Sequence, residues 1–204
     1  DEGRIKIDAG IYAEYTSNYK LWEGLLGYAC EQGLGLQLHL AQTPGEVEEC
    51  LERTGMNPGE LLNCHGLFNV PATAAGCGYL DPMERKLLGK KKVTAVALPL
   101  AAAKNGMSCA PILECVQAGM NVALGTDGAA SNNHLNLMEE MHLAAVLHNG
   151  FTHDPTLMKP AQVLNMATRN GARLQGRDDT GALEVGKKAD IIAIDLTRPH
   201  LFPN

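Results

Sequence analysis

The feature that most constrains the fold of this chain is a repeated alternation of strand-like and helix-like segments. Short apolar or alternating runs occur at residues 5–11, 35–40, 72–77, 93–98 and 121–126, and a helix-like segment follows each of them. Alternation at this spacing is typical of parallel strands connected by covering helices. The sequence therefore predicts an α/β fold built from five βα units.

Capping residues mark several of the expected helices. The segment 19–32 carries apolar residues on one face and stops at Gly33, a residue that readily adopts the left-handed conformation of a helix end. Thr43 and Pro44 open the next helix, since threonine caps and proline fits the first turn. Further helices are expected at residues 58–64, 81–89, 110–118, 135–147 and 160–174.

The end of the chain has a different pattern. Residues 181–190 are rich in turn-forming residues and predict a hairpin, which leads into an apolar strand at residues 191–195. We therefore expect residues 1–178 to form the α/β unit and residues 179–204 to form a hairpin-and-strand tail.

Composition limits the class of protein and its partners. A chain of 204 residues, 45% hydrophobic and 20% charged, is long enough for one real core. The formal net charge is -6, and the lysines at residues 90–92 are the one notable basic cluster, so no nucleic-acid partner is expected. No apolar run reaches the roughly 18 residues of a membrane span. The first residues do not resemble a signal peptide, and the cysteines form no CxxC, which together predict a cytoplasmic protein.

The motif Gly125-Thr126-Asp127-Gly128 is the first candidate for chemistry. Asp127 follows a buried strand, at the edge where parallel α/β folds build their sites. A carboxylate there can hold a metal ion and accept a proton from activated water. It can equally be a loop aspartate that accepts hydrogen bonds from nearby amides. We expect the following residues 131–133 to cap the next helix.

His39 is the second candidate, because it lies near the end of the strand at residues 35–40. A histidine on the polar side of a strand end is a fair metal ligand, although a lone histidine is more often a hydrogen-bonded core residue. Gln42 lies three residues further on, and its amide can form hydrogen bonds but does not titrate. The other histidines are expected to be surface or capping groups: His65, His134, His142, His148, His153 and His200.

Residues 125–133, followed by Leu135-Asn136-Leu137-Met138-Glu139-Glu140-Met141, closely resemble the amidohydrolase superfamily. The most similar branch is that of the methylthioadenosine/S-adenosylhomocysteine deaminases, which also resemble triazine-type chlorohydrolases. Residues 183–190 resemble the family's return into a small β-sandwich. The resemblance covers nearly the whole chain, and residues 10–16, 39–43, 73–77, 98–99 and Asp127 match the fourth to eighth barrel strands.

This resemblance implies part of a (β/α)8 TIM-type barrel, from strand four to strand eight, with the start of a C-terminal sandwich. It implies one divalent metal ion, zinc or iron, held by a His-x-His pair on strand one, a histidine on strand five and an aspartate on strand eight. His39 and Asp127 match the last two ligands. The metal would activate water to attack a ring carbon of an aminopurine-like substrate and release ammonia, with Asp127 as the base.

Several positions depart from the family pattern. The sequence contains no His-x-His pair, so two of the implied ligands are missing. Gln42 stands where the family has its proton-transferring glutamate, and Gly76 where it has a histidine that assists at the metal. Tyr12 stands where a histidine usually faces the substrate. On strand seven, only Pro99 remains of the family's serine-histidine-asparagine-proline run.

These departures leave two functions open. The first is an amidohydrolase-like hydrolase of C–N bonds, but loss of one general acid or base typically costs about 10²–10⁴ in rate. A site with two ligands also binds metal weakly, because affinity grows with the number and orientation of ligands. The alternative is a non-catalytic homologue that acts as a binding or structural subunit. In either case five parallel strands leave exposed edges, which predicts either self-association or a partner chain that completes the barrel, or a rearranged open α/β sheet.

Overall fold

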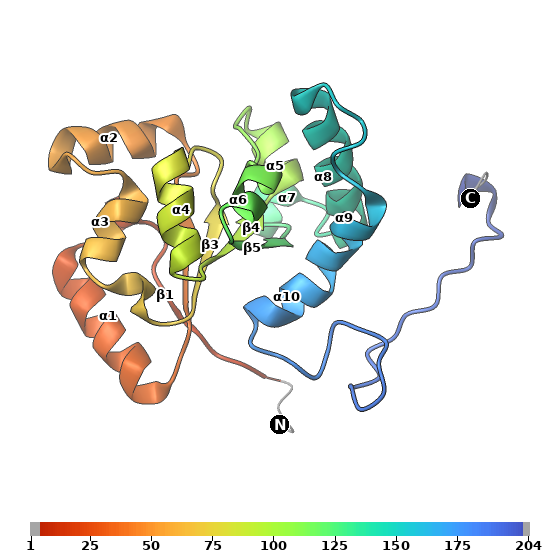
Figure 1. Ribbon diagram of the computed structural model, residues 1–204, viewed down its shortest axis with the longest axis horizontal. Helices are drawn as coiled ribbons and strands as arrows, with labels where there is room; N and C mark the ends of the chain where they lie inside the picture. Colours follow the sequence, from red (N-terminus) through yellow and green to blue (C-terminus); the bar gives the residue numbers. More distant parts are fainter. Residues whose placement is uncertain (1–4, 202–204) are drawn as a thin grey trace.

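The computed structural model describes residues 5–201, except for the side chain of His200. Its centre is one parallel sheet in which the five strands lie side by side in chain order, β1-β2-β3-β4-β5 (Figure 1). This confirms the predicted α/β fold with five parallel strands. The strands are β1 (Ala9–Gly10), β2 (Leu36–Leu40), β3 (Ala72–Gly76), β4 (Thr94–Ala97) and β5 (Asn121–Leu124).

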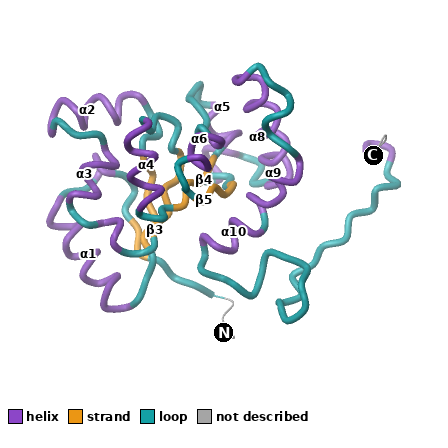
Figure 2. Tube along the Cα trace, in the orientation of Figure 1, coloured by secondary structure: helices purple, strands orange, loops and turns teal. Residues whose placement is uncertain are grey.

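Helices connect the strands (Figure 2). The α-helices are α1 (Tyr19–Gln32), α2 (Pro44–Thr54), α3 (Pro58–Cys64), α4 (Pro82–Lys90), α5 (Pro99–Lys104), α6 (Ile112–Gln117), α7 (Ala129–Asn132), α8 (Leu137–Thr152), α9 (Pro160–Ala167) and α10 (Arg169–Leu174). Short 3-10 helices lie at Glu14–Thr16, Leu67–Asn69 and Pro199–Leu201. None of the helices found among residues 5–201 is long and apolar enough to cross a membrane.

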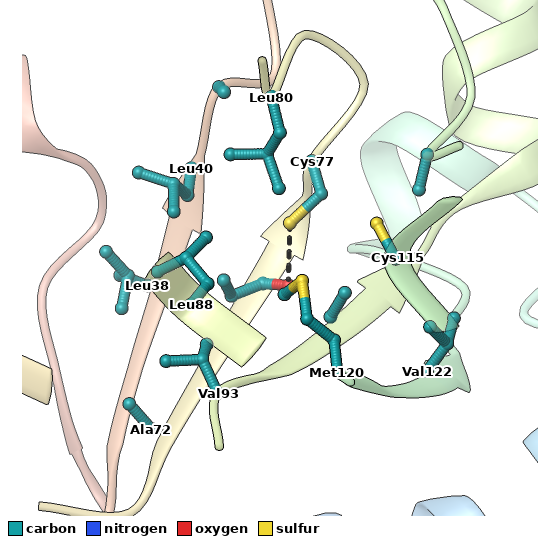
Figure 3. Packing of buried hydrophobic residues seen from close by; sticks show 14 of the residues in the cluster. Leu38, Leu40, Ala72, Cys77, Leu80, Leu88, Val93, Cys115, Met120 and Val122 are labelled. Carbon is teal, nitrogen blue, oxygen red and sulfur yellow. Dashed lines mark hydrogen bonds between the residues drawn. The ribbon is translucent and has the colours of Figure 1, made fainter. Parts of the chain in front are cut away.

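The main hydrophobic core lies between one face of the sheet and the helices. Along β2 the residues alternate, so that Leu36, Leu38 and Leu40 are buried while Gln37 is exposed. The buried leucines join side chains from the other strands and from the helices in one cluster, part of which Figure 3 shows around Leu88. The opposite face of β2 therefore carries Gln37 and His39, and it is the face available to a functional site.

Three buried glutamates hold loops in place by accepting two hydrogen bonds each. Glu46 binds the backbone N–H groups of residues 41 and 42, both at 2.8 Å. Glu84 binds those of residues 59 and 81, at 2.8 and 3.1 Å. Glu140 binds the amide side chain of Asn132 at 2.6 Å and the backbone N–H of residue 100 at 3.0 Å. Buried carboxylates are costly without partners, so these paired bonds explain how they are tolerated.

Two predicted elements differ from the structure. The first strand, expected at residues 5–11, is limited to Ala9–Gly10, where it pairs with β2. The helix expected at residues 160–174 is broken into α9 and α10, because Thr168 has non-helical backbone angles of φ -121° and ψ -87°. The short helices α5 and α7 were not expected from the sequence.

The predicted strand at residues 191–195 is wrong for the described structure. This part of the chain is an extended trace (Figure 1) whose residues 191, 192 and 194 line a cavity together with residues of α8 and α9, and no strand is assigned in it. A turn does form, with the N–H of Lys187 bonded to the carbonyl of Glu184 at 3.2 Å. A strand needs a neighbour for its backbone groups, and no described segment pairs with these residues. The boundary near residue 178 stays a prediction.

Candidate functional site

The candidate site lies where the carboxyl ends of β2 and β5 approach each other. His39 Nε2 lies 3.7 Å from Asp127 Oδ1, and both side chains are partly buried. Two further strands, β3 and β4, separate β2 from β5 in the sheet. The sheet must therefore curve strongly for these residues to meet, as it does in an arc of a closed barrel. The structure thus brings together the two residues that the sequence suggested as metal ligands.

The ring of His39 is oriented by the main chain of Tyr12. The carbonyl oxygen of Tyr12 accepts the backbone N–H of His39 at 2.8 Å and lies 3.2 Å from its ring Nδ1. A carbonyl can only accept, so this contact requires the proton on Nδ1. In the neutral form of the ring, the lone pair is then on Nε2, on the side facing Asp127. Metal-binding histidines typically have this arrangement, with the second ring nitrogen bonded to a carbonyl.

The spacing of the pair fits two neighbouring positions around one metal ion. Ligand atoms about 2.1 Å from a tetrahedral ion lie about 3.4 Å from each other, close to the observed separation of 3.7 Å. Among the described residues, however, no group of three or more His, Cys, Asp or Glu side chains could hold an ion. His39 and Asp127 therefore form only part of a ligand set.

Asp127 is held in an unusual backbone conformation. Its φ angle is 63°, in the left-handed region that non-glycine residues rarely adopt. Such strain costs about 1–3 kcal/mol and often occurs at functional sites. The helix expected to begin after residues 131–133 is instead capped by Asn136, whose side chain accepts the N–H of Met138 at 3.1 Å. Asn132 has a different role, because its Oδ1 accepts the N–H groups of residues 134 and 135.

Gln42 and Gly76 lie in direct contact at the ends of β2 and β3. A Cβ atom added to Gly76 would lie 3.0 Å from Cβ and 3.1 Å from Cγ of Gln42. Gly76 also has a φ angle of 93°, which favours glycine. Positions 42 and 76 thus share one space, which holds the amide side chain of Gln42 and no side chain from Gly76. Neither group can transfer a proton at neutral pH.

Tyr12 lies beside His39 at the mouth of the site. The ring centroids are 4.9 Å apart, and 58% of Tyr12 is exposed. Tyr15 approaches Tyr12 edge to face, with a centroid separation of 6.4 Å. Burial and the neighbouring Tyr12 raise the pKa of Tyr15. A cavity of about 290 Å³ on this side of the sheet is lined by Gly10, Tyr12, Gln37, His39, Thr73 and Ala75. An exposed aromatic ring at such a mouth can stack against a planar ligand.

Most of the other histidines lie where the sequence placed them, but His148 does not. His142 is exposed, His134 pairs with Glu139 at the surface, and His153 ends α8. His148 is buried, its Nε2 has no hydrogen-bond partner among the described residues, and burial lowers its pKa. The expectation that His148 is a surface or capping group is therefore wrong, because it is buried inside α8. The side chain of His200 lies outside the described residues.

Sequence reasoning also missed Glu46, which supports the loop that carries Gln42. The signal was present, because Thr43 caps α2 by accepting the N–H of Glu46 at 3.1 Å. A glutamate three residues after a cap usually reaches back towards the start of its helix. Glu46 reaches further, to the two residues before the cap.

Comparison with known proteins places this geometry in a family context. A model of the amidohydrolase family matches residues 1–203. Two 5-methylthioadenosine/S-adenosylhomocysteine deaminases are similar over 203 residues, from Moorella thermoacetica at 43% identity and from Caldanaerobacter subterraneus at 42%. Each match covers 99% of this chain and 47% of the relative. The chain therefore spans about half the length of these relatives.

Solved structures agree with the sequence matches. An adenosine deaminase from Xanthomonas campestris with bound zinc superimposes with a TM-score of 0.90 at 32% identity, over 95% of this chain and 44% of that one. A mutant atrazine chlorohydrolase from Arthrobacter aurescens, complexed with zinc and atraton, gives a TM-score of 0.84 at 28% identity, over 92% and 42%. The five-stranded sheet is thus a partial barrel of the kind these proteins contain.

Proposed function

Because this chain belongs to the amidohydrolase family, we propose that it is the C-terminal part of a metal-dependent hydrolase of C–N bonds in aminopurine-like rings. The observation that supports this most is the separation of 3.7 Å between His39 Nε2 and Asp127 Oδ1. The two groups come from non-adjacent strands and are matched in chemistry to one divalent ion.

In this proposal His39 and Asp127 hold one side of the metal, with zinc or iron as the candidate ion. When bound, the ion would lower the pKa of a water molecule and polarise the carbon that is attacked. Asp127 is the carboxylate placed to take the proton of the attacking water. The ring of Tyr12 provides a face on which a planar substrate can stack.

Among residues 5–201, positions 42 and 76 supply no donor for proton transfer to the departing ammonia. Gln42 does not titrate, and Gly76 has no side chain. Their contact therefore supports a second candidate function, a non-catalytic subunit that binds a ligand or stabilises an assembly. The rate of any residual hydrolysis is expected to be about 10²–10⁴-fold lower than that of a site with a general acid in place.

The proposal includes a partner that completes the barrel. The relatives are about twice as long, and this chain supplies five parallel strands with an exposed edge at β1. Apolar side chains of the tail, including Ile191, Ile192 and Ile194, are also exposed. Either a second copy of this chain or a separate polypeptide with three strands and a His-x-His pair would cover such surfaces.

The six cysteines are free, which supports a cytoplasmic location.

A zinc titration tests the metal site. Isothermal titration of the chain should detect zinc binding that is lost in His39→Ala and in Asp127→Asn. His142→Ala is the control, because His142 is exposed on α8 away from the site. Equal binding by all four proteins would rule out this site. Mixing the chain with a polypeptide that supplies the three strands should tighten binding, and ammonia release from adenosine-type substrates then separates the enzyme from the non-catalytic subunit.

A further inference from the structure

The carboxylate of Glu46 lies directly beneath the loop that follows β2. Only 5% of this residue is exposed. Its Oε1 accepts the N–H of Ala41 and its Oε2 accepts the N–H of Gln42, both at 2.8 Å. Bonds from amides to a carboxylate are about twice as strong as bonds between neutral groups. One buried side chain therefore fixes two successive backbone groups of the loop.

This loop needs support because its conformation is strained. Ala41 has a φ angle of 47°, in the left-handed region that costs a non-glycine residue about 1–2 kcal/mol. Two carbonyls of this turn are held by the loop that follows β3, since Cys77 and Tyr79 donate their N–H groups to the carbonyls of Leu40 and Ala41. The chain is thereby turned at Ala41, so that Gln42 lies against Gly76.

We propose that Glu46 is a positioning residue of the candidate metal site, which fixes the turn after β2 and so sets the placement of His39 and Gln42. His39 lies two residues before the first amide that Glu46 binds, and its ring faces Asp127. A relaxed turn would shift the end of β2 and change both the bond from Nδ1 to Tyr12 and the direction of Nε2. The inference rests on the proposed metal site for its functional meaning, but the positioning itself can be measured without metal.

The charges around Glu46 are consistent with this role. Burial raises its pKa and the nearby Glu14 raises it further, while the N–H groups of Gln42, Ala41 and Thr43 lower it. Glu14 is itself buried and paired with Arg53 at 2.5 Å. The positive charge of Arg53 thus offsets the negative charge of Glu14. The direct hydrogen-bond partners of the Glu46 carboxylate are the backbone N–H groups of Ala41 and Gln42.

Glu84 provides a matched control in the same chain. It is also buried and also accepts two backbone N–H groups, but these belong to Gly59 and Asp81, away from the strand ends that form the site. Glutamine in place of either glutamate keeps the shape of the side chain but replaces one accepting carboxylate oxygen with a donating NH2 group. That NH2 group would then face a backbone N–H group, which also donates. Both substitutions should therefore lower stability, whereas only one should alter the site.

The test compares Glu46→Gln with Glu84→Gln by nitrogen NMR of the imidazole of His39 and by cobalt(II) titration followed by visible absorption. We expect Glu46→Gln to change the ring-nitrogen shifts of His39, with loss of the Nδ1–H form, and to weaken cobalt affinity by about 10–100-fold. Glu84→Gln should leave both readouts as in the original chain. Glu46→Asp, which keeps the charge on a shorter side chain, gives the same comparison if the glutamine variant does not fold.

Unchanged ring-nitrogen shifts in a folded Glu46 variant would overturn the inference, whatever the metal does. Equal changes in the Glu46 and Glu84 variants would overturn it as well, because they would reflect general destabilisation. Absence of cobalt binding by the original chain would instead count against the proposed metal site, and the NMR comparison would still decide the role of Glu46.

Discussion

Gln42 fills the space that a side chain at Gly76 would need, since an added Cβ would lie 3.0 Å from Cβ of Gln42. Positions 42 and 76 are therefore coupled: with φ at 93°, position 76 accepts glycine and little else. Placing a histidine at position 76 is not a local change, because the loop carrying residue 42 must move with it.

Gly76→Ala should lower the free energy of unfolding by about 2 kcal/mol or more, through strain and the contact with Gln42. Gly27→Ala is the control, because Gly27 is exposed in α1 with nothing near its added Cβ. That variant should gain up to about 1 kcal/mol from helix propensity. Urea denaturation measures both, and an unchanged stability of Gly76→Ala would show that the loop adapts freely.

Asp127→Gly should stabilise the chain while removing the metal site. The left-handed backbone at Asp127 suits glycine, so relief of strain should raise the free energy of unfolding by about 0.5–1 kcal/mol. Asp127→Ala keeps the strain and should show no such gain, although it also loses the carboxylate. Thermal unfolding of both variants checks this, and equal melting temperatures would mean that the conformation at this position is not strained.

Ionisation of the Glu84 carboxyl group should lower the free energy of unfolding as pH rises from about 4.5 to 7. Burial raises the pKa of Glu84 from 4.5 to about 7, ahead of the opposing hydrogen bonds from residues 81 and 59. The folded chain then binds more protons than the unfolded chain in this window, so stability decreases with pH. Glu84→Gln should remove about 1–3 kcal/mol of this decrease. Parallel slopes for both proteins between pH 4.5 and 7 would contradict the assignment.

His148 should have the opposite effect at lower pH. Burial lowers its pKa below 6.5, so the unfolded chain binds more protons and stability is lost as pH falls below about 6.5. His148→Leu should therefore be more stable than the original chain at pH 5.5, by on the order of 1 kcal/mol. His142→Leu, an exposed position on the same helix, should not change the pH dependence. A loss of stability in His148→Leu at pH 5.5 would show that the imidazole has an essential partner.

The order and type of the elements followed from the sequence because they depend on local patterns. The alternation at Leu36–Leu40 predicted β2, and Gly33 ends α1 in the left-handed conformation expected of it, with a φ of 63°. Where the pattern depended on a partner, as in residues 191–195, the sequence predicted a strand that the described chain does not form.

The site was only partly predictable for a related reason. His39 and Asp127 could each be placed at a strand end, but their separation depends on sheet curvature, which is set by packing across the whole sheet. The burial of His148 was missed because the predicted helix stopped at residue 147. In the structure α8 continues to Thr152, and His148 lies one turn after the buried Ala144 on the same face.

The unpaired apolar run at residues 191–194 should make the purified chain prone to aggregation. Ile191, Ile192 and Ile194 are β-branched, exposed and without strand partners in the described structure. Runs of this kind pair with identical runs of other molecules in cross-β aggregates. The useful concentration of the purified chain is therefore expected to be limited by aggregation, and a lysine in place of Ile192 should extend it.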